Sequence, residues 1–278
     1  MIRFQQPGSA PENTELFDLT DRGLLLADGV FDTSRVVGGR IIQKRPHLLR
    51  LASDAAALGI GANLSELEGL AQEAVPEGAN GALRLTVTRG PGGPGGRGLS
   101  GGTIGGPTLM ARFSPMELAF PMPSISLRIS NIRRNPTSPS ARHKTLSYTD
   151  NIMALREAMA MGDDEALLLS PEGRVACASA ANVFALFGNL LVTPPLSEGV
   201  LPGVVRGWLI GAAREAGLEV AQESLTPERL AEADSIFLTN SLRIFQPVRE
   251  FSGRTFETEL PAGLIGLGKT LLEGGFDD

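Results

Sequence analysis

One lysine, Lys144, stands in a polar loop within the stretch SARHKTLSYTD. The chain has only three lysines, Lys44, Lys144 and Lys269, and its other basic side chains are arginines. A loop lysine beside a helix is most often a solvated charge. A lysine amine can also form a Schiff base with a carbonyl compound when burial or nearby cations activate it. Arg142 and His143 could supply such cations, but spacing alone leaves both interpretations open.

A second candidate feature is a helix start that suits an anion. The stretch LPGVVRGWL places Gly203, Val204 and Val205 at the predicted N-terminus of a helix. Main-chain N–H groups and the helix dipole favour negative charge there, and a glycine allows close approach. An ordinary helix that begins after Pro202 would show the same pattern. The residues alone are therefore compatible with a phosphate site without requiring one.

A third motif, GLIGLGKT from Gly263 to Thr270, matches the G-x-x-x-x-G-K-T pattern of nucleotide-binding loops. Such a loop needs a strand before it, a helix after it and a later aspartate that holds magnesium. The chain ends eight residues after Thr270. We therefore expect a C-terminal helix with spaced glycines here, and no nucleotide site.

Composition narrows the class of protein. The 278 residues suffice for one large domain or two modest ones. The net charge of −6 does not indicate a protein that binds nucleic acid, because such proteins usually carry an excess of basic residues. No apolar run approaches the ~20 residues of a membrane span, and the N-terminus lacks the apolar core of a signal peptide. Cys177 is the only cysteine, and His47 and His143 are the only histidines. We therefore expect a cytoplasmic protein without disulfides, metal, membrane or nucleic-acid partners.

The first half of the chain predicts a small α/β domain. VVGGRII is typical of a hairpin with a Gly-Gly turn, and RPHLLRLASDAAALGI has the apolar spacing of a helix. NLSELEGLAQEAV predicts a second helix with a capping box at Ser65, followed by the strands ALRLTVTR and TLMARF. A glycine-rich stretch separates these strands, and three prolines in SPMELAFPMP indicate a linker.

The second half predicts a larger domain of strands and helices. SISLRISNIRR, EALLLS, NVFALFGNLLVT and SIFLTN are expected strands, and PGVVRGWLIGAAREAG is an expected helix that ends near Gly217. Another helix after Lys144 carries Tyr148, Ile152 and Met159 on one apolar face, together with Leu155. The chain is thus expected to be α+β, with domains at 1–117 and 118–278.

Several motifs, in order along nearly the whole chain, resemble the fold-type IV enzymes that depend on pyridoxal 5'-phosphate. They are DRGLLLADGVFDTSRVVGGRI, HLLRL, HKTLSYTDNIMALREA, DEALLLSPEGRV and SAANVFALFGNLLVTPPLSEGVLPGVVR. This group, the class IV aminotransferases, includes D-amino acid transaminases, branched-chain aminotransferases and aminodeoxychorismate lyases. The resemblance implies a two-domain, D-amino acid aminotransferase-like fold, a small-molecule substrate and a homodimer.

The resemblance also implies roles for individual residues. Lys144 would hold the cofactor as a Schiff base and then move the substrate proton, which one amine can do in turn. Taken alone, Arg50 is most simply a solvated helix arginine, and Tyr148, the only tyrosine, could be a core aromatic with its hydroxyl at the surface. The family match implies a cofactor site composed of Arg50, Lys144, Tyr148, Cys177, Gly203, Val204, Val205, Asn240 and Ser241. In it, Arg50 and the hydroxyl of Ser241 would bind the phosphate, and Tyr148 the phenolic oxygen.

The variable parts of the sequence point to a substrate. TRGPGGPGGRGLS resembles the glycine-rich loop of aminodeoxychorismate lyases, and Arg97 within it could hold a substrate carboxylate. Phe31 is assigned to the same substrate site. The expected reaction is conversion of 4-amino-4-deoxychorismate to 4-aminobenzoate and pyruvate, in folate biosynthesis. A D-amino acid or branched-chain aminotransferase is the alternative.

One position departs from the family pattern. Members carry a glutamate within V-T-E-x-x-x-x-N, facing the pyridine nitrogen of the cofactor, whereas this chain reads VACASAAN with Cys177 there. A glutamate keeps the nitrogen protonated, and a neutral thiol cannot. Transamination should suffer more from this change than an elimination driven by aromatisation. A degenerate protein that only binds pyridoxal phosphate is a third hypothesis.

Overall fold

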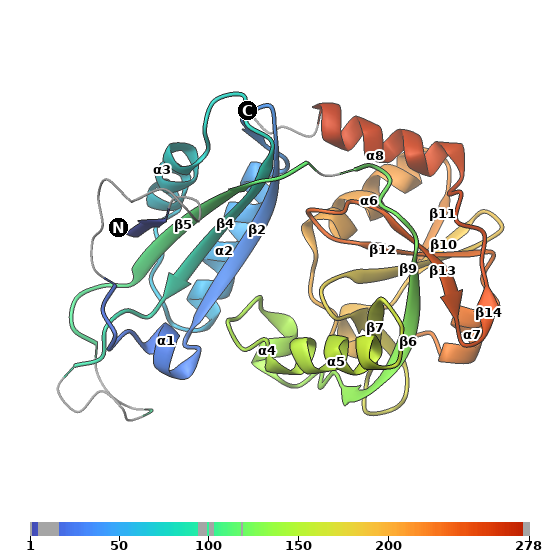
Figure 1. Cartoon of the computed structure of the whole chain (residues 1–278), viewed down its shortest axis with the longest axis horizontal. Coiled ribbons are helices and arrows are strands. Elements are labelled where there is room, and N and C mark those ends of the chain that lie inside the picture. Colours follow the sequence, from blue (N-terminus) through green and yellow to red (C-terminus); the bar gives the residue numbers. More distant parts are fainter. Residues whose placement is uncertain (1, 5–16, 94–98, 100–102, 118, 275–278) are drawn as a thin grey trace. The chain divides into compact units, whose positions relative to one another are not determined.

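The computed structural model describes residues 2–4, 17–93, 99, 103–117 and 119–274. By compactness the chain divides into two units, each described by itself below (Figure 1). The first unit runs to Glu117 and also includes His143–Ser147, and the second contains the segment up to Arg142 and Tyr148–Gly274. The predicted boundary at 117/118 would place Lys144 in the C-terminal domain, whereas its segment groups with the first unit.

The first unit is a sheet covered by helices. Its sheet has the strand order β1-β5-β4-β2-β3, in which β1 runs parallel to β5 and the other neighbours are antiparallel. Helices α2 and α3 pack against the sheet and against each other (Figure 1). The elements are β1 (Ile2–Phe4), α1 (Arg22–Leu26), β2 (Gly29–Val37), β3 (Arg40–Ile41), α2 (Lys44–Ala57), α3 (Leu64–Ala74), β4 (Gly81–Thr88) and β5 (Thr108–Pro115).

The hairpin and the first long helix form as predicted. Gly38 and Gly39 both have positive φ, at 58° and 80°, and this allows the tight turn between β2 and β3. In α2 the buried apolar residues Leu48, Leu51 and Ala55 follow helical spacing and face the sheet. The cap of α3 differs from the prediction, because Asn63 is the N-cap and its Oδ1 accepts the N–H of Ser65.

The second unit holds a larger sheet. In the described residues it has nine strands in the order β11-β10-β9-β12-β13-β6-β7-β8, with β14 paired to β13. Helix α5 packs on β6 and β7, and α6 packs on β11 and α8 (Figure 1). The strands are β6 (Ile125–Arg133), β7 (Glu165–Leu169), β8 (Val175–Ala178), β9 (Asn182–Phe187), β10 (Leu190–Thr193), β11 (Glu219–Gln222), β12 (Ser235–Thr239), β13 (Gln246–Phe251) and β14 (Arg254–Thr255). The helices are α4 (Pro139–Arg142), α5 (Thr149–Ala160), the 3₁₀ helix η1 (Leu196–Glu198), α6 (Val204–Glu215), α7 (Pro227–Ala231) and α8 (Ala262–Gly274).

The buried face of α5 is not the predicted one. Ile152 is 48% exposed and Met159 is 62% exposed, whereas Asn151, Ala154 and Ala158 are buried. The alanines lie in one apolar cluster with residues of β7 and β8. Small side chains let the helix approach the strands closely, so the expectation that the larger apolar residues face the core is wrong. The overall α+β class is confirmed.

The motif GLIGLGKT lies entirely within α8, which confirms the predicted C-terminal helix. A Cβ at Gly268 would overlap the ring of Phe120 and approach that of Phe245, so this glycine serves helix packing. The geometry of a phosphate-binding loop between a strand and a helix is not present at these residues. None of the helices in the described part of the chain combines the length and hydropathy of a membrane span.

Candidate active site

The lysine segment His143–Ser147 is attached to the first unit through main-chain contacts with β2. The carbonyl of Lys144 accepts the N–H of Phe31 at 2.9 Å, and the N–H of Leu146 donates to the carbonyl of Gly29 at 2.9 Å. Thr145 forms an antiparallel bridge with Val30. The chain therefore holds Lys144 as if on a short additional strand beside β2.

The Lys144 amine lies over an aromatic ring. Its Nζ is 4.5 Å from the ring centroid of Phe31, and the guanidinium carbon of Arg84 on β4 is 3.7 Å from the same centroid. Phe31 is 7% exposed and Lys144 is half-buried. The structure thus brings two of the predicted residues, Phe31 and Lys144, into contact, and it adds Arg84, which the sequence analysis did not single out.

Arg50 is part of a buried charged cluster. Its Nε and Nη2 donate to the two carboxylate oxygens of Asp32, each at 2.9 Å, and Nδ1 of His47 lies 2.7 Å from the same carboxylate. Asp32 and His47 are 2% and 3% exposed. Burial alone would raise the pKa of Asp32, but the charges of Arg50, His47 and Lys144 together hold it below its ordinary range. Asp32 is therefore ionised, and it fixes the guanidinium of Arg50 in one orientation.

A second buried carboxylate, Asp54, contacts the lysine segment directly. Its Oδ2 accepts the main-chain N–H of Lys144 at 3.0 Å, and its Oδ1 lies 2.8 Å from Nδ1 of His143. From the sequence, His143 and Arg142 are candidate cations that could activate the lysine amine. In the structure the His143 ring is bound to Asp54, and Arg142 is an exposed residue at the end of α4.

In the second unit, the predicted phosphate residues stand at the start of α6. Gly203 is the N-cap, and within the described residues no side chain caps this helix, so its first N–H groups face outward from the helix end. A Cβ at Gly203 would overlap Oδ1 of Asn182. The Nδ2 of Asn182 donates to the carbonyl of Leu201 at 3.0 Å. Asn182 on β9 thus shapes the loop before α6, and only glycine fits at position 203.

Arg206 adds a positive charge to the first turn of α6. It is 4% exposed, and one of its nitrogens donates to the carbonyl of Pro194 at 2.9 Å and to Oε1 of Gln222 at 2.8 Å. Burial lowers its pKa to about 10, which leaves it charged at neutral pH. Its Nε is buried without a hydrogen-bond partner among the described residues. Arg206 therefore contributes a buried positive charge from the first turn of α6.

Asn240 and Ser241 follow β12, the strand that pairs with β9. The Oδ1 of Asn240 accepts the N–H groups of Leu242 and Arg243, and its Nδ2 donates to the carbonyl of Ala180 at 3.1 Å. Thr239 is paired with Asn182 across the strands, and its hydroxyl is buried without a partner among the described residues. Asn240 therefore organises the turn that presents Ser241, and an unsatisfied hydroxyl lies beside it.

Tyr148 and Cys177 complete the predicted residues of the second unit. Tyr148 is half-buried and is the N-cap of α5. Cys177 lies on β8 opposite Leu168 of β7 and is 6% exposed. Burial raises the pKa of the Cys177 thiol; Arg134 opposes this effect and Glu165 adds to it. The thiol is therefore neutral at physiological pH.

The predicted site differs from the structural one in identifiable ways. Arg97 lies outside the described residues, so its role stays a prediction. The sequence analysis did not single out Asp32, Asp54, Asn182 or Arg206. Asp54 stands four residues after Arg50 on one helix, and this spacing was the available signal. The other three are recognisable only from their contacts.

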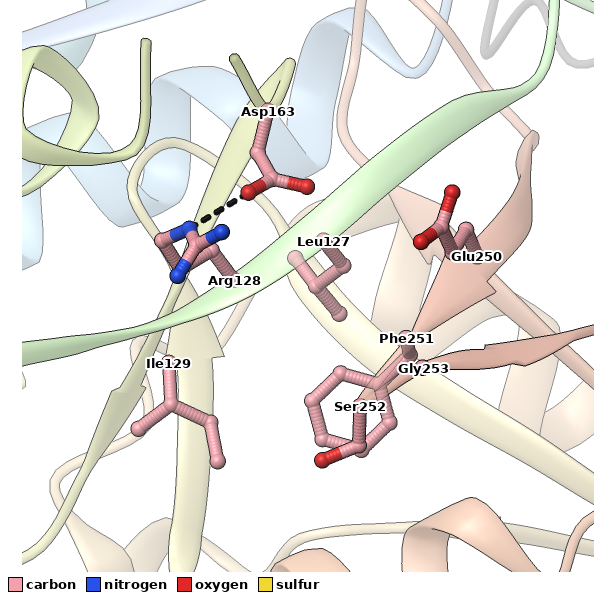
Figure 2. Close-up of a pocket in the computed structure, with 8 residues that line it drawn as sticks. All are labelled: Leu127, Arg128, Ile129, Asp163, Glu250, Phe251, Ser252 and Gly253. Atoms are coloured by element: carbon pink, nitrogen blue, oxygen red, sulfur yellow. Dashed lines mark hydrogen bonds and ion pairs between the residues drawn. The ribbon is translucent and has the colours of Figure 1, made fainter. Parts of the chain in front are cut away.

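A cavity of about 280 Å³ lies elsewhere in the second unit, on β6 and β13 (Figure 2). Arg128 and Asp163 point toward one another across one wall, and Phe251 and Ser252 lie at another (Figure 2). Glu250 gives the lining a second carboxylate against a single guanidinium. This negative lining is unsuited to a phosphate, and none of the predicted site residues contributes to it.

Comparisons with known proteins agree with the motifs. The family model described as amino-transferase class IV matches residues 29–251. A Methanocaldococcus jannaschii protein, provisionally named a branched-chain-amino-acid aminotransferase, is 32% identical over 86% of this chain and 84% of its own length. The aminodeoxychorismate lyase of Bacillus subtilis is 30% identical over 80% of this chain and 77% of its own.

A solved structure shares the fold. A Legionella pneumophila protein, provisionally named a 4-amino-4-deoxychorismate lyase, superimposes with a TM-score of 0.83 at 28% identity, over 95% of this chain and 97% of that one. The expected fold-type IV architecture is therefore confirmed. Enzymes of this class depend on pyridoxal 5'-phosphate. From the motifs, the fold and the family match together, the chain belongs to the class IV aminotransferases.

Proposed function

We propose that this enzyme is a pyridoxal phosphate-dependent lyase that converts 4-amino-4-deoxychorismate to 4-aminobenzoate and pyruvate, a step of folate biosynthesis. The residues present fit the cofactor. In the second unit the uncapped start of α6, the buried Arg206 charge and the orphaned hydroxyl of Thr239 suit a dianion. In the first unit Arg50, held by Asp32, supplies a further cation.

The predicted residues divide into those that bind the cofactor and those that contact the substrate. Arg50, Ser241, Asn240 and the N–H groups of Gly203, Val204 and Val205 bind the phosphate. The Tyr148 hydroxyl bonds to the phenolic oxygen, and Phe31 and Arg97 contact the substrate. When bound, the cofactor withdraws electrons from the carbon that carries the amino group.

Lys144 is the catalytic residue of the proposal. Its amine would hold the cofactor, and during the reaction it would lie beside the substrate carbon whose proton must leave. It removes the ring proton and delivers a proton to the departing enolpyruvyl group, which leaves as pyruvate. The remaining ring becomes aromatic as 4-aminobenzoate.

The observation that carries the choice of a lyase is the neutral, buried thiol of Cys177. A carboxylate at this position would favour protonation of the cofactor ring nitrogen. A thiol whose pKa is raised by burial does not. Aromatisation of the product supplies driving force that transamination lacks, so the lyase reaction depends less on a protonated ring.

Aminotransfer from a branched-chain amino acid is the second candidate function, favoured by the 32% identity to the M. jannaschii protein. The deciding experiment incubates purified protein with 4-amino-4-deoxychorismate, and separately with branched-chain or D-amino acids and 2-oxoglutarate. We expect 4-aminobenzoate and pyruvate in equal amounts. Glutamate formation without 4-aminobenzoate would favour the aminotransferase, and turnover of neither substrate would favour a protein that only binds the cofactor.

A cytoplasmic homodimer is part of the proposal. Large apolar side chains are exposed on α1 and α5, among them Leu24, Leu25, Ile152 and Met159. Burial of such side chains in a second copy would stabilise a dimer. Light scattering of the purified protein should give twice the mass of 29.3 kDa, and a monomer mass would contradict the assembly. Cell fractionation tests the location.

A further inference from the structure

Asp54 joins the lysine segment to helix α2. The carboxylate is 5% exposed, and it accepts the Lys144 N–H at 3.0 Å while contacting the His143 ring at 2.8 Å. The next peptide unit, on the other side of the Lys144 Cα, is held by β2, because the Lys144 carbonyl accepts the Phe31 N–H at 2.9 Å. The main chain of Lys144 is therefore fixed on both sides, by a buried side chain and by a strand.

The same helix carries the predicted phosphate residue. Arg50 and Asp54 are four residues apart in α2, so they lie on one face and are separated by about 6 Å along the axis. Arg50 is itself immobilised by two hydrogen bonds to the buried Asp32. Helix α2 therefore holds one cation for the phosphate and one acceptor for the lysine main chain at a fixed spacing.

This spacing matters for a rigid ligand that attaches at two points. Pyridoxal phosphate carries its phosphate and its aldehyde on one aromatic ring, so the distance between them varies little. An amine held at the matching distance from Arg50 reacts as if at high local concentration, whereas a displaced amine loses that advantage.

We propose that Asp54 is a positioning residue that sets the Lys144 amine at the correct distance from Arg50. The proposal rests on the proposed function, because it assumes that Lys144 and Arg50 bind one cofactor. The reaction itself is addition of the amine to the aldehyde with loss of one water, and a hydride reagent traps the product as a secondary amine.

The test compares two aldehydes, pyridoxal phosphate and pyridoxal, which lacks the phosphate. Full-length protein freed of cofactor is mixed with each aldehyde and cyanoborohydride, and peptide mapping gives the initial labelling rate of Lys144. Lys44 and Lys269 are internal references. In wild type we expect pyridoxal phosphate to label Lys144 much faster than pyridoxal does. Asp54→Ala should lower this rate ratio about tenfold or more, because the Lys144 amine is no longer held at the required distance from Arg50.

Two further variants distinguish the effect of Asp54 on the position of Lys144 from an effect of its charge or of protein folding. Asp54→Asn should keep a ratio near that of wild type, because its amide oxygen can accept the Lys144 N–H. Asp28→Asn also loses a part-buried carboxylate of the first unit, but Asp28 pairs with Arg22 at 2.9 Å and Arg89 at 2.7 Å, so its ratio should be unchanged. A general loss of structure would also lower this ratio, so circular dichroism must show that Asp54→Ala is folded before its ratio is interpreted.

Each outcome decides the proposal. An unchanged ratio in Asp54→Ala, or an equal fall in Asp54→Asn, overturns the positioning role while leaving the proposed function intact. No preference for Lys144 in wild type overturns the proposed function and this inference with it. If Asp54→Ala does not fold, hydrogen exchange in wild type decides, since the Lys144 amide should be protected and fast exchange would contradict the bond to Asp54.

Discussion

The two units hold their candidate site residues in position with different kinds of side chain. In the first unit, Arg50 and the Lys144 segment are held by buried carboxylates, Asp32 and Asp54. In the second unit, the start of α6 and the turn at Ser241 are shaped by the neutral amides of Asn182 and Asn240. The pair of Arg50 and Asp32 depends on ionisation, whereas the second unit depends on shape and neutral hydrogen bonds.

The difference follows from what each group has to do. A half-buried cation such as Arg50 needs a compensating charge, and that charge fixes its orientation as well. A helix start already favours an anion through its N–H groups, so it needs only room for close approach. Substitutions of Arg50 and Asp32 should therefore act through charge, and substitution of Gly203 should act through sterics.

The largest effect is expected at Lys144. Lys144→Ala removes the amine that links to the cofactor and moves the proton, so turnover should fall by about 10²–10⁴ or more. Borohydride reduction of wild type followed by peptide mapping should place the pyridoxyl group on Lys144. Lys44→Ala and Lys269→Ala are the matched controls for turnover. A pyridoxyl label on Lys44 or Lys269 of the wild-type protein would contradict the assignment of Lys144.

A steric effect is expected at Gly203. Gly203→Ala forces a Cβ against Asn182, so it should destabilise the second unit by about 1–3 kcal/mol and weaken cofactor binding. The control is Gly207→Ala in the same helix, where a Cβ meets open space. Gly207→Ala should instead stabilise by about 0.5–1 kcal/mol. Equal melting temperatures for the two variants would remove the steric argument.

A charge effect is expected at Arg50. Charge-assisted hydrogen bonds contribute roughly 1.5–3 kcal/mol each, so Arg50→Ala should weaken cofactor affinity about tenfold or more. The variant also leaves Asp32 buried with fewer cations, which lowers stability. Arg50→Ala combined with Asp32→Asn should recover stability without recovering affinity. Unchanged affinity in the single variant would exclude Arg50 from the site.

A shift in reaction preference is expected at Cys177. Cys177→Glu places a carboxylate where the thiol is now neutral, and it should raise half-transamination of amino acids relative to lyase turnover. The ratio of the two rates is the measurement, because it cancels any loss of folded protein. An unchanged ratio, or one shifted toward the lyase, would show that position 177 does not control the ring nitrogen.

The smallest effect is a change in acid stability. The pKa of Asp32 lies below its ordinary value of 3.8, so the unfolded chain binds this proton first as the pH falls. The stability that Asp32 contributes is complete above that value and is lost as the pH falls through the lower, folded pKa. Asp32→Asn should therefore lose stability less steeply below pH 3.8 in denaturant titrations, and an identical slope would contradict the charged cluster.

Local sequence determined much of this protein. Two adjacent glycines specified the hairpin between β2 and β3, and Pro202 followed by Gly203 located the start of α6. The motifs around Lys144 and along the rest of the chain indicate the family from sequence alone. These features are readable because turns, helix starts and cofactor motifs depend on residues that are neighbours in the chain.

Tertiary structure decided the rest. The segment of Lys144 follows Arg142 of the second unit in sequence, yet its hydrogen bonds to Phe31 and Asp54 group it with the first unit. The inward face of α5 was set by the alanines that fit against the strands, not by its larger apolar residues. Such pairings join residues far apart in the chain, and their energies depend on packing and burial that no local pattern of residue types records.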